Sequence, residues 1–210
     1  MRGFSAEFRA ELDALMRWRR DVRHFRPDPV PPELLAECLA AFRHAPSVGL
    51  SEPWRLVSVE SDGARQAALD NFRAANAEAL KGYAGEKAAL YAGLKLSGMQ
   101  EAPVQIAVFC DEETPKGAGL GAATMPEMRR YSVALAVMGF WLALRARGLG
   151  LGWVSILDPD RLRADLDLPA GWRLVAYLCL GWPRDDSMTP ELETVGWESR
   201  AEGIPAPIRR

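Results

Sequence analysis

The amino-acid sequence predicts one α+β domain spanning residues 1–210, and three observations support this fold class. The length of 210 residues suits one compact domain with a sizeable core and is short for two. Helix and strand patterns are interspersed without the regular strand–helix alternation of a doubly wound parallel sheet. No internal repeat or low-complexity segment divides the chain. We therefore expect a single sheet flanked by helices.

Composition and charge argue against several classes of protein. The formal net charge is −2, so the basic excess of a nucleic-acid-binding protein is absent. The longest apolar run, at 133–144, is too short to span a bilayer, and the N-terminal residues lack the apolar core of a signal peptide. The three cysteines are far apart and lie in apolar runs, which favours a reducing compartment. We expect a cytoplasmic protein with no nucleic-acid or membrane partner.

The first half of the chain begins with two predicted helices. Ser5 is suited to cap an amphipathic helix at 6–18, and Pro31 and Pro32 are suited to open a second helix at 32–44. Prolines between the two helices keep the intervening stretch from being helical. The remaining predictions for this half are a loop at 45–53, a strand at 54–61, helices at 63–80 and 84–99, and a strand at 103–111.

The second half begins with a glycine-rich loop at 112–124. A long helix at 126–147 follows, and its second half is apolar enough to be buried. Asp158 is suited to cap a short helix that reaches about residue 166. Strands are predicted at 149–157 and 173–182, and a polar tail begins at about 183. The tail carries Trp197, so we expect it to pack on a partner subunit rather than to be disordered.

Three common kinds of site are not favoured. "GAGLGAA" at 117–123 matches a dinucleotide-binding pattern, but "DEETPK" separates it from the preceding strand and no acid follows at about twenty residues. A second glycine-rich stretch, "GLGLG" at 148–152, follows a helix and is interpreted as a helix stop. The two histidines, His24 and His44, have no second ligand at metal spacing, so no metal is expected. The G-x-S-x-G motif of a serine hydrolase is also absent.

The strongest chemical signal is "RRDVRHFRP" at 19–27, which places an acid among several arginines. A run of charges is commonly a solvated surface, but this one lies between two helices and includes apolar anchors. Guanidinium groups bind phosphate oxygens in pairs, so the arginines favour a bound phosphate. Asp21 would be a poor phosphate ligand, whereas neighbouring cations favour its ionised form, which suits a hydrogen-bond acceptor or a base.

Three segments carry a resemblance to a known family: "RRDVRHFRPDPVP", "APSVGLSEPW" and "GLGLGWVSI…LCLGWP". Together they resemble the flavin-dependent nitroreductase superfamily and, within it, the 5,6-dimethylbenzimidazole synthase branch, over about residues 12–200. The resemblance implies a nitroreductase-like fold with a mixed, mainly antiparallel sheet. It also implies a domain-swapped homodimer with FMN at the subunit interface. "GYAGEKAALYAGLKLSGM" resembles the branch's lid over the flavin, so a lid is expected within about 63–99.

The resemblance also implies a reaction. Ordinary nitroreductases carry a serine where this chain has Asp21, and the aspartate marks the branch. That branch consumes reduced FMN (FMNH2) with dioxygen and releases 5,6-dimethylbenzimidazole, the lower ligand of vitamin B12, and D-erythrose 4-phosphate. A separate flavin reductase would supply the FMNH2, and no nicotinamide site is expected on this chain.

Site residues follow from the resemblance position by position. Asp21 and Ser155 are implied as the catalytic residues. The implied flavin contacts are Arg19, Arg20, Asp21, Val22 and Arg23 for the phosphate and ribityl chain, Ser47 and Gly49 for the flavin and oxygen pocket, Lys95 and Leu96 for the lid, and Val154 and Ser155 facing the ring.

Two alternatives stay open. The first is a conventional FMN-dependent nitroreductase or quinone reductase, which would keep its flavin intact and oxidise NAD(P)H. The second is a non-catalytic flavin-binding or basic-patch protein, which would form no product. The chain also departs from the family pattern at Glu52, where glutamine is usual before Pro-Trp, and this places a negative charge near the expected pocket.

Overall fold

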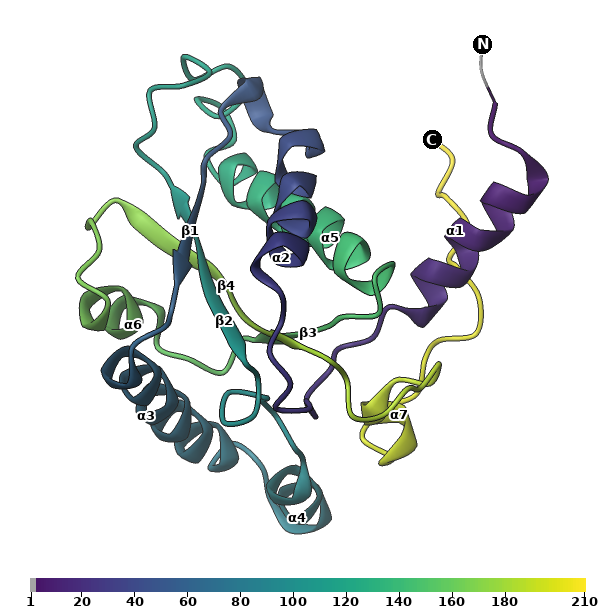
Figure 1. The fold of residues 1–210 in the computed structure, drawn as a ribbon, viewed down its shortest axis with the longest axis vertical. Helices are drawn as coiled ribbons and strands as arrows, with labels where there is room; N and C mark the ends of the chain where they lie inside the picture. The colour runs from purple at the N-terminus through teal and green to yellow at the C-terminus, as the bar shows by residue number, and fades with distance from the viewer. Residues whose placement is uncertain (1–2) are drawn as a thin grey trace.

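The computed structural model describes residues 3–210 and contains a four-stranded sheet between two layers of helices (Figure 1). The strand order is β1-β2-β4-β3, and each neighbouring pair is antiparallel. The strands are β1 (Trp54–Ser58), β2 (Val104–Asp111), β3 (Gly150–Val154) and β4 (Trp172–Gly181). This arrangement confirms the predicted α+β class and its mainly antiparallel sheet.

Helices cover both faces of the sheet. The α-helices are α1 (Ala6–Trp18), α2 (Pro32–Leu39), α3 (Asp62–Leu80), α4 (Gly85–Gly93), α5 (Met128–Arg145), α6 (Pro159–Asp165) and α7 (Glu191–Thr194). Figure 1 shows α2 and α5 on one face and α3 and α6 on the other, with α1 standing apart from the sheet. No helix of the described residues is both long and apolar enough to cross a membrane.

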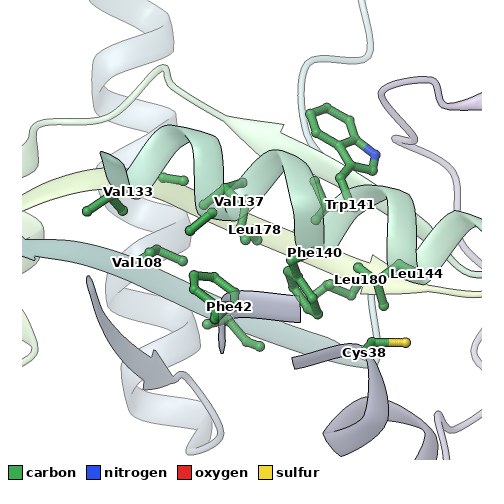
Figure 2. Close-up of a cluster of buried hydrophobic side chains, with 14 of the residues drawn as sticks. Cys38, Phe42, Val108, Val133, Val137, Phe140, Trp141, Leu144, Leu178 and Leu180 are labelled. Carbon is green, nitrogen blue, oxygen red and sulfur yellow. The ribbon is translucent and has the colours of Figure 1, made fainter. Parts of the chain in front are cut away.

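The buried residues form two clusters because successive side chains of a strand point to opposite faces. On β2, Val108 faces the cluster built on α5, which includes Phe42 and Phe140 (Figure 2). The next residue, Phe109, faces the second cluster, which includes Phe72 of α3. Burial of both faces explains why the inner strands are continuous apolar runs rather than alternating ones.

Several element boundaries differ from the prediction. The strand predicted at 54–61 ends at Ser58, and the helix predicted at 32–44 becomes a 3₁₀ helix from Ala40. The helix predicted at 84–99 ends at Gly93, because Leu94 is extended and the Lys95 carbonyl bonds to a distant arginine instead of continuing the helix. The tail, predicted as polar from about residue 183, contains the short helix α7.

Candidate functional site

The arginine-rich segment after α1 lies along the open edge of β3. Val22 N–H donates to the Leu151 carbonyl at 3.0 Å, and Asp21 forms a parallel bridge with Leu151. Further along, Arg26 N–H donates to the Trp182 carbonyl at 2.9 Å. The segment therefore covers a sheet edge that would otherwise present unpaired backbone groups, and its side chains are fixed relative to β3.

Glycines in β3 make this close approach possible. A Cβ on Gly152 would lie 2.2 Å from the Val22 carbonyl oxygen, and one on Gly150 would lie 2.9 Å from Val22 Cγ2. The prediction that 148–152 is only a helix stop is therefore incomplete. Gly148, with φ +78°, does end the turn after α5, but the next two glycines accommodate the arginine-rich segment.

Gly152→Ala is expected to lower the free energy of unfolding by about 1–3 kcal/mol, since the added methyl group forces the backbone of the arginine-rich segment to move. Urea unfolding monitored by circular dichroism measures the change. Gly63→Ala is the matched control, because a Cβ at Gly63 meets nothing within 4 Å. Equal stability of the Gly152 and Gly63 variants would contradict the close approach.

Asp21 is held by donors on both carboxylate oxygens. Its Oδ2 accepts from Arg23 Nε at 2.8 Å, and its Oδ1 accepts from Trp153 N–H of β3 at 2.8 Å. The side chain is nevertheless 33% exposed and lines a cavity of about 180 Å³. The carboxylate is thus fixed in orientation and open on one side, as a group that exchanges a proton with a ligand must be.

Four arginines, Arg19, Arg20, Arg23 and Arg200, line the same cavity. Arg19 Nε is buried and has no hydrogen-bond partner among the described residues, while its guanidinium carbon lies 4.4 Å from the centre of the Trp141 ring. Arg20 donates to the Met188 carbonyl at 2.7 Å and so ties the segment to the tail. Arg200, which was not singled out from the sequence, lines the cavity with them. Arg200 can be recognised as part of the cluster only in the folded chain, because its neighbours in the sequence give no sign of a site.

The charges in this cluster act on one another. Burial lowers the pKa of Arg19. The negative charge of Asp21 acts to raise this pKa, and the positive charge of Arg200 lowers it further. Burial and the neighbouring Arg200 and Arg19 lower the pKa of Arg20. An anion between these guanidinium groups would relieve their repulsion and supply the missing partner of Arg19 Nε. The cluster therefore fits a phosphate group.

The segment that follows α4 is joined directly to this cluster. Arg23 Nη1 donates to the Lys95 carbonyl at 2.9 Å, and the Lys95 ammonium pairs with Glu101. Leu96 packs against the buried cluster on the α3 face of the sheet. Lys95 and Leu96 therefore lie beside the arginine-rich segment.

The last residues of β3 lie close to Asp21 along the same strand. Val154 ends β3 and is buried, whereas Ser155 follows the strand and is exposed. The strand predicted at 149–157 therefore ends before Ser155. Ser155 is two residues beyond Trp153, whose N–H bonds to Asp21, so the two positions are separated by about 7 Å of extended chain.

Ser47 and Gly49 lie at the other end of the sheet. They precede β1, whose first residue is Trp54. Trp54 pairs with Cys110 of β2, and Cys110 pairs with Arg173 near the start of β4. Asp21 bridges Leu151 of β3, and Leu151 pairs with Leu180 near the end of β4. Leu180 lies seven residues beyond Arg173, which corresponds to about 23 Å of strand. Figure 1 shows the segment leading into β1 and the segment following α1 at opposite ends of the sheet. One chain therefore does not bring all the predicted pocket residues together.

The local structure at Ser47 and Gly49 is well determined by contacts. Ser47 Oγ accepts from Glu52 N–H at 3.1 Å, and Gly49 has φ +58°, which favours glycine. A Cβ on Gly49 would lie 2.9 Å from the Leu120 carbonyl oxygen of the glycine-rich loop. Glu52, the departure noted in the sequence, forms an ion pair with Lys116, so its charge is compensated within the chain.

Metal ligands were not expected from the sequence. Within residues 3–210, no group of three or more histidine, cysteine, aspartate or glutamate side chains is arranged to hold a metal ion. The cysteines Cys38, Cys110 and Cys179 are unpaired and buried.

Comparison with known proteins agrees with the fold. The nitroreductase family model matches residues 16–182. A 5,6-dimethylbenzimidazole synthase from Rhodospirillum rubrum is 55% identical and covers 99% of this chain and 97% of its own length. A protein of the same name from Rhodobacter capsulatus is 45% identical and covers 99% of both chains.

Among solved structures, iodotyrosine deiodinase bound to FMN and 3-iodo-L-tyrosine superposes with a TM-score of 0.73. It is 24% identical and covers 95% of this chain and 100% of its own, so the likeness concerns the fold. The chain belongs to the nitroreductase family, within the group of relatives named 5,6-dimethylbenzimidazole synthase.

Proposed function

We propose that the protein is a 5,6-dimethylbenzimidazole synthase that consumes reduced FMN and dioxygen and releases 5,6-dimethylbenzimidazole and D-erythrose 4-phosphate. The observation that carries the proposal is Asp21, an oriented carboxylate open to a cavity lined by arginines. The full-length similarity to proteins of that name supports it.

The residues of the cluster fit the flavin in a defined way. Arg19, Arg20 and Arg200 would hold the phosphate, and Val22, Arg23 and Lys95 would line the ribityl chain. Val154 and Ser155 at the end of β3 would face the ring. When bound, reduced FMN supplies both the electrons for dioxygen and the carbon atoms of the product.

Asp21 is proposed to take up and return a proton during cleavage of the ribityl bond. Arg23 and Trp153 occupy one acceptor position on each oxygen and keep the carboxylate in one orientation, so the remaining lone pairs face the cavity. Ser155 is exposed, so solvent or a ligand can reach its side chain. It is therefore available to donate to a ligand or to relay a proton.

A lid over the flavin is proposed for α4 and the segment at 94–97. The predicted lid, about 63–99, also included α3, but Ala68 and Phe72 of that helix are buried against the sheet. The side chain of Asn71 on α3 also forms two hydrogen bonds with the backbone of Asp158: its Oδ1 accepts from the Asp158 N–H at 2.8 Å, and its Nδ2 donates to the Asp158 carbonyl at 2.9 Å. Closure by α4 alone would exclude water from the cavity while α3 stays in the core.

A homodimer with FMN at the subunit interface is proposed because one chain leaves the pocket incomplete. Ser47 and Gly49 would reach the flavin of the partner, since they lie far from Asp21 of their own chain. Apolar side chains left exposed support such an interface. They are Phe4, Phe8, Leu12 and Met16 beside or on α1, and Tyr131, Leu135 and Met138 on α5. Monomers rarely leave contiguous apolar faces of this kind uncovered.

The remaining parts of the proposal concern exchange of the tail, compartment and electron supply. Exchange between subunits is proposed for residues 201–210 of the tail. Ile204 and Ile208 in this segment are 96% and 77% exposed, so a partner subunit could cover them. The unpaired cysteines agree with the cytoplasm as compartment. A separate flavin reductase is proposed as the source of reduced FMN.

The test is to incubate the protein with FMN, a chemical reductant and air, and to analyse the mixture by liquid chromatography and mass spectrometry. The proposal expects flavin to disappear as 5,6-dimethylbenzimidazole appears in equal amount. Oxidation of NAD(P)H with a nitroaromatic acceptor while flavin is fully recovered would instead identify a conventional nitroreductase. Absence of both reactions with flavin bound would identify a flavin-binding protein without this activity.

A further inference from the structure

We propose that Trp197 is a positioning residue that holds Arg200 in the arginine cluster by docking the tail on α4. This inference rests on the proposed function, because it concerns how the cluster binds the phosphate of FMN. The sequence predicted that the tail packs on a partner subunit, and within one chain Trp197 packs on α4.

The Trp197 side chain lies in a pocket made by α4 and the turn before it. Its ring meets Tyr83 edge-on at 5.4 Å between centroids and Tyr91 at 6.0 Å. Lys87 Nζ lies 3.8 Å from the centre of the indole ring and donates to the Trp197 carbonyl at 2.7 Å. Aromatic and cation–π contacts act here together with a hydrogen bond, so the indole and the backbone of one residue are both held.

The backbone that precedes Trp197 is held in place by α7. Trp197 N–H donates to the Leu192 carbonyl at 2.8 Å, and Gly196 adopts φ +73° at the end of the helix. This is the usual way in which a helix ends with a left-handed glycine and satisfies its last carbonyls. The tail therefore reaches α4 in one conformation.

Arg200 follows Trp197 by three residues, so its Cα lies within about 10 Å of the Trp197 Cα. It lines the same cavity as Arg19 and Arg20. Four guanidinium groups line this cavity against two carboxylates, those of Asp21 and Glu191, so its net charge is positive and Arg200, which is exposed, is repelled by the other arginines. Docking of Trp197 offsets this repulsion by limiting where Arg200 can go.

The consequence is a physical link between the proposed lid and the phosphate site. Displacement of α4 would move the surface on which Trp197 sits, and with it Arg200. The same segment is tied to the cluster a second time, by the bond from Arg23 to the Lys95 carbonyl. Lid position and affinity for the phosphate are therefore expected to change together.

The experiment is a double-mutant cycle on full-length protein, with Trp197→Ala, Arg200→Ala and the double variant titrated with FMN and with riboflavin, which lacks the phosphate. Arg200→Ala is expected to weaken FMN binding about tenfold, as loss of one charge-assisted contact does. Trp197→Ala is expected to weaken FMN binding about three- to tenfold, because Arg200 is then no longer held in the cluster. The double variant should match Arg200→Ala, and riboflavin affinity should stay within about twofold throughout.

Trp197→Phe should restore most of the FMN affinity because the aromatic contacts remain. Arg73→Ala, at a 55% exposed position on α3 away from the cluster and the tail, is the control without effect. Additive losses in the double variant, or an equal loss of riboflavin binding, would overturn the role of Trp197 while leaving the proposed function intact. If the unsubstituted protein bound no FMN, both would be overturned.

Discussion

Replacement of Asp21 with asparagine is expected to reduce formation of 5,6-dimethylbenzimidazole by about a hundredfold or more, the usual contribution of a positioned acid or base. FMN affinity is expected to change by less than about tenfold, since the arginines remain. Asparagine has nearly the same shape, and its carbonyl oxygen can still accept from Trp153 N–H. It has no carboxylate to take up a proton. Product is measured by mass spectrometry and binding by flavin fluorescence.

Two further variants sharpen this prediction. Asp28→Asn is the matched control, because Asp28 is 56% exposed and forms only a surface pair with Arg26. Asp21→Ser introduces the residue that ordinary nitroreductases carry, and we expect it to bind FMN without consuming it. Product formation by Asp21→Asn at the normal rate would contradict the catalytic role of the carboxylate.

Leu135→Glu is expected to dissociate the proposed dimer and abolish most FMN binding. Leu135 is 53% exposed and shares one face of α5 with Tyr131 and Met138, at helical spacing. An unpaired carboxylate in the apolar interface costs several kcal/mol, which is comparable to the stability of many dimers. FMN binding is expected to be lost as well, because the proposed pocket includes Ser47 and Gly49 of the partner subunit. Light scattering measures the mass, and fluorescence titration measures FMN affinity.

Leu135→Met is the control for this prediction, because it keeps an apolar side chain of similar volume and should remain dimeric. A Leu135→Glu protein that stayed dimeric with full FMN affinity would show that this face of α5 is not the interface. A monomer that bound FMN normally would contradict the claim that the pocket needs two chains.

The sequence was sufficient for the fold class and for the approximate place of each strand. The run "PVQIAVFCD" predicts β2 within one residue at its start, since a strand buried on both faces must be apolar along its length. The end of α4 was not predictable, because it depends on a bond from Arg23 to the Lys95 carbonyl, 72 residues away. Local propensity contains no information about such a partner.

The site was predicted in part. The arginines and Asp21 were recognised because their charges are contiguous in sequence. The purpose of Gly152 was missed, since only the three-dimensional approach of Val22 requires a residue without a side chain. Arg200 was missed for a related reason: it joins the cluster through the fold of the tail, about 180 residues after Arg19. The separation of Ser47 from Asp21 likewise depends on strand register, which the sequence does not reveal.

The central claim is that the flavin is consumed as a substrate, and an isotope experiment tests it most directly. FMN labelled with ¹³C at the ribityl C1′ is reduced, mixed with the protein and exposed to air, and the benzimidazole product is examined by mass spectrometry and NMR. We expect 5,6-dimethylbenzimidazole carrying the label at C2. Recovery of intact labelled FMN after aerobic turnover, with no labelled benzimidazole, would contradict the account.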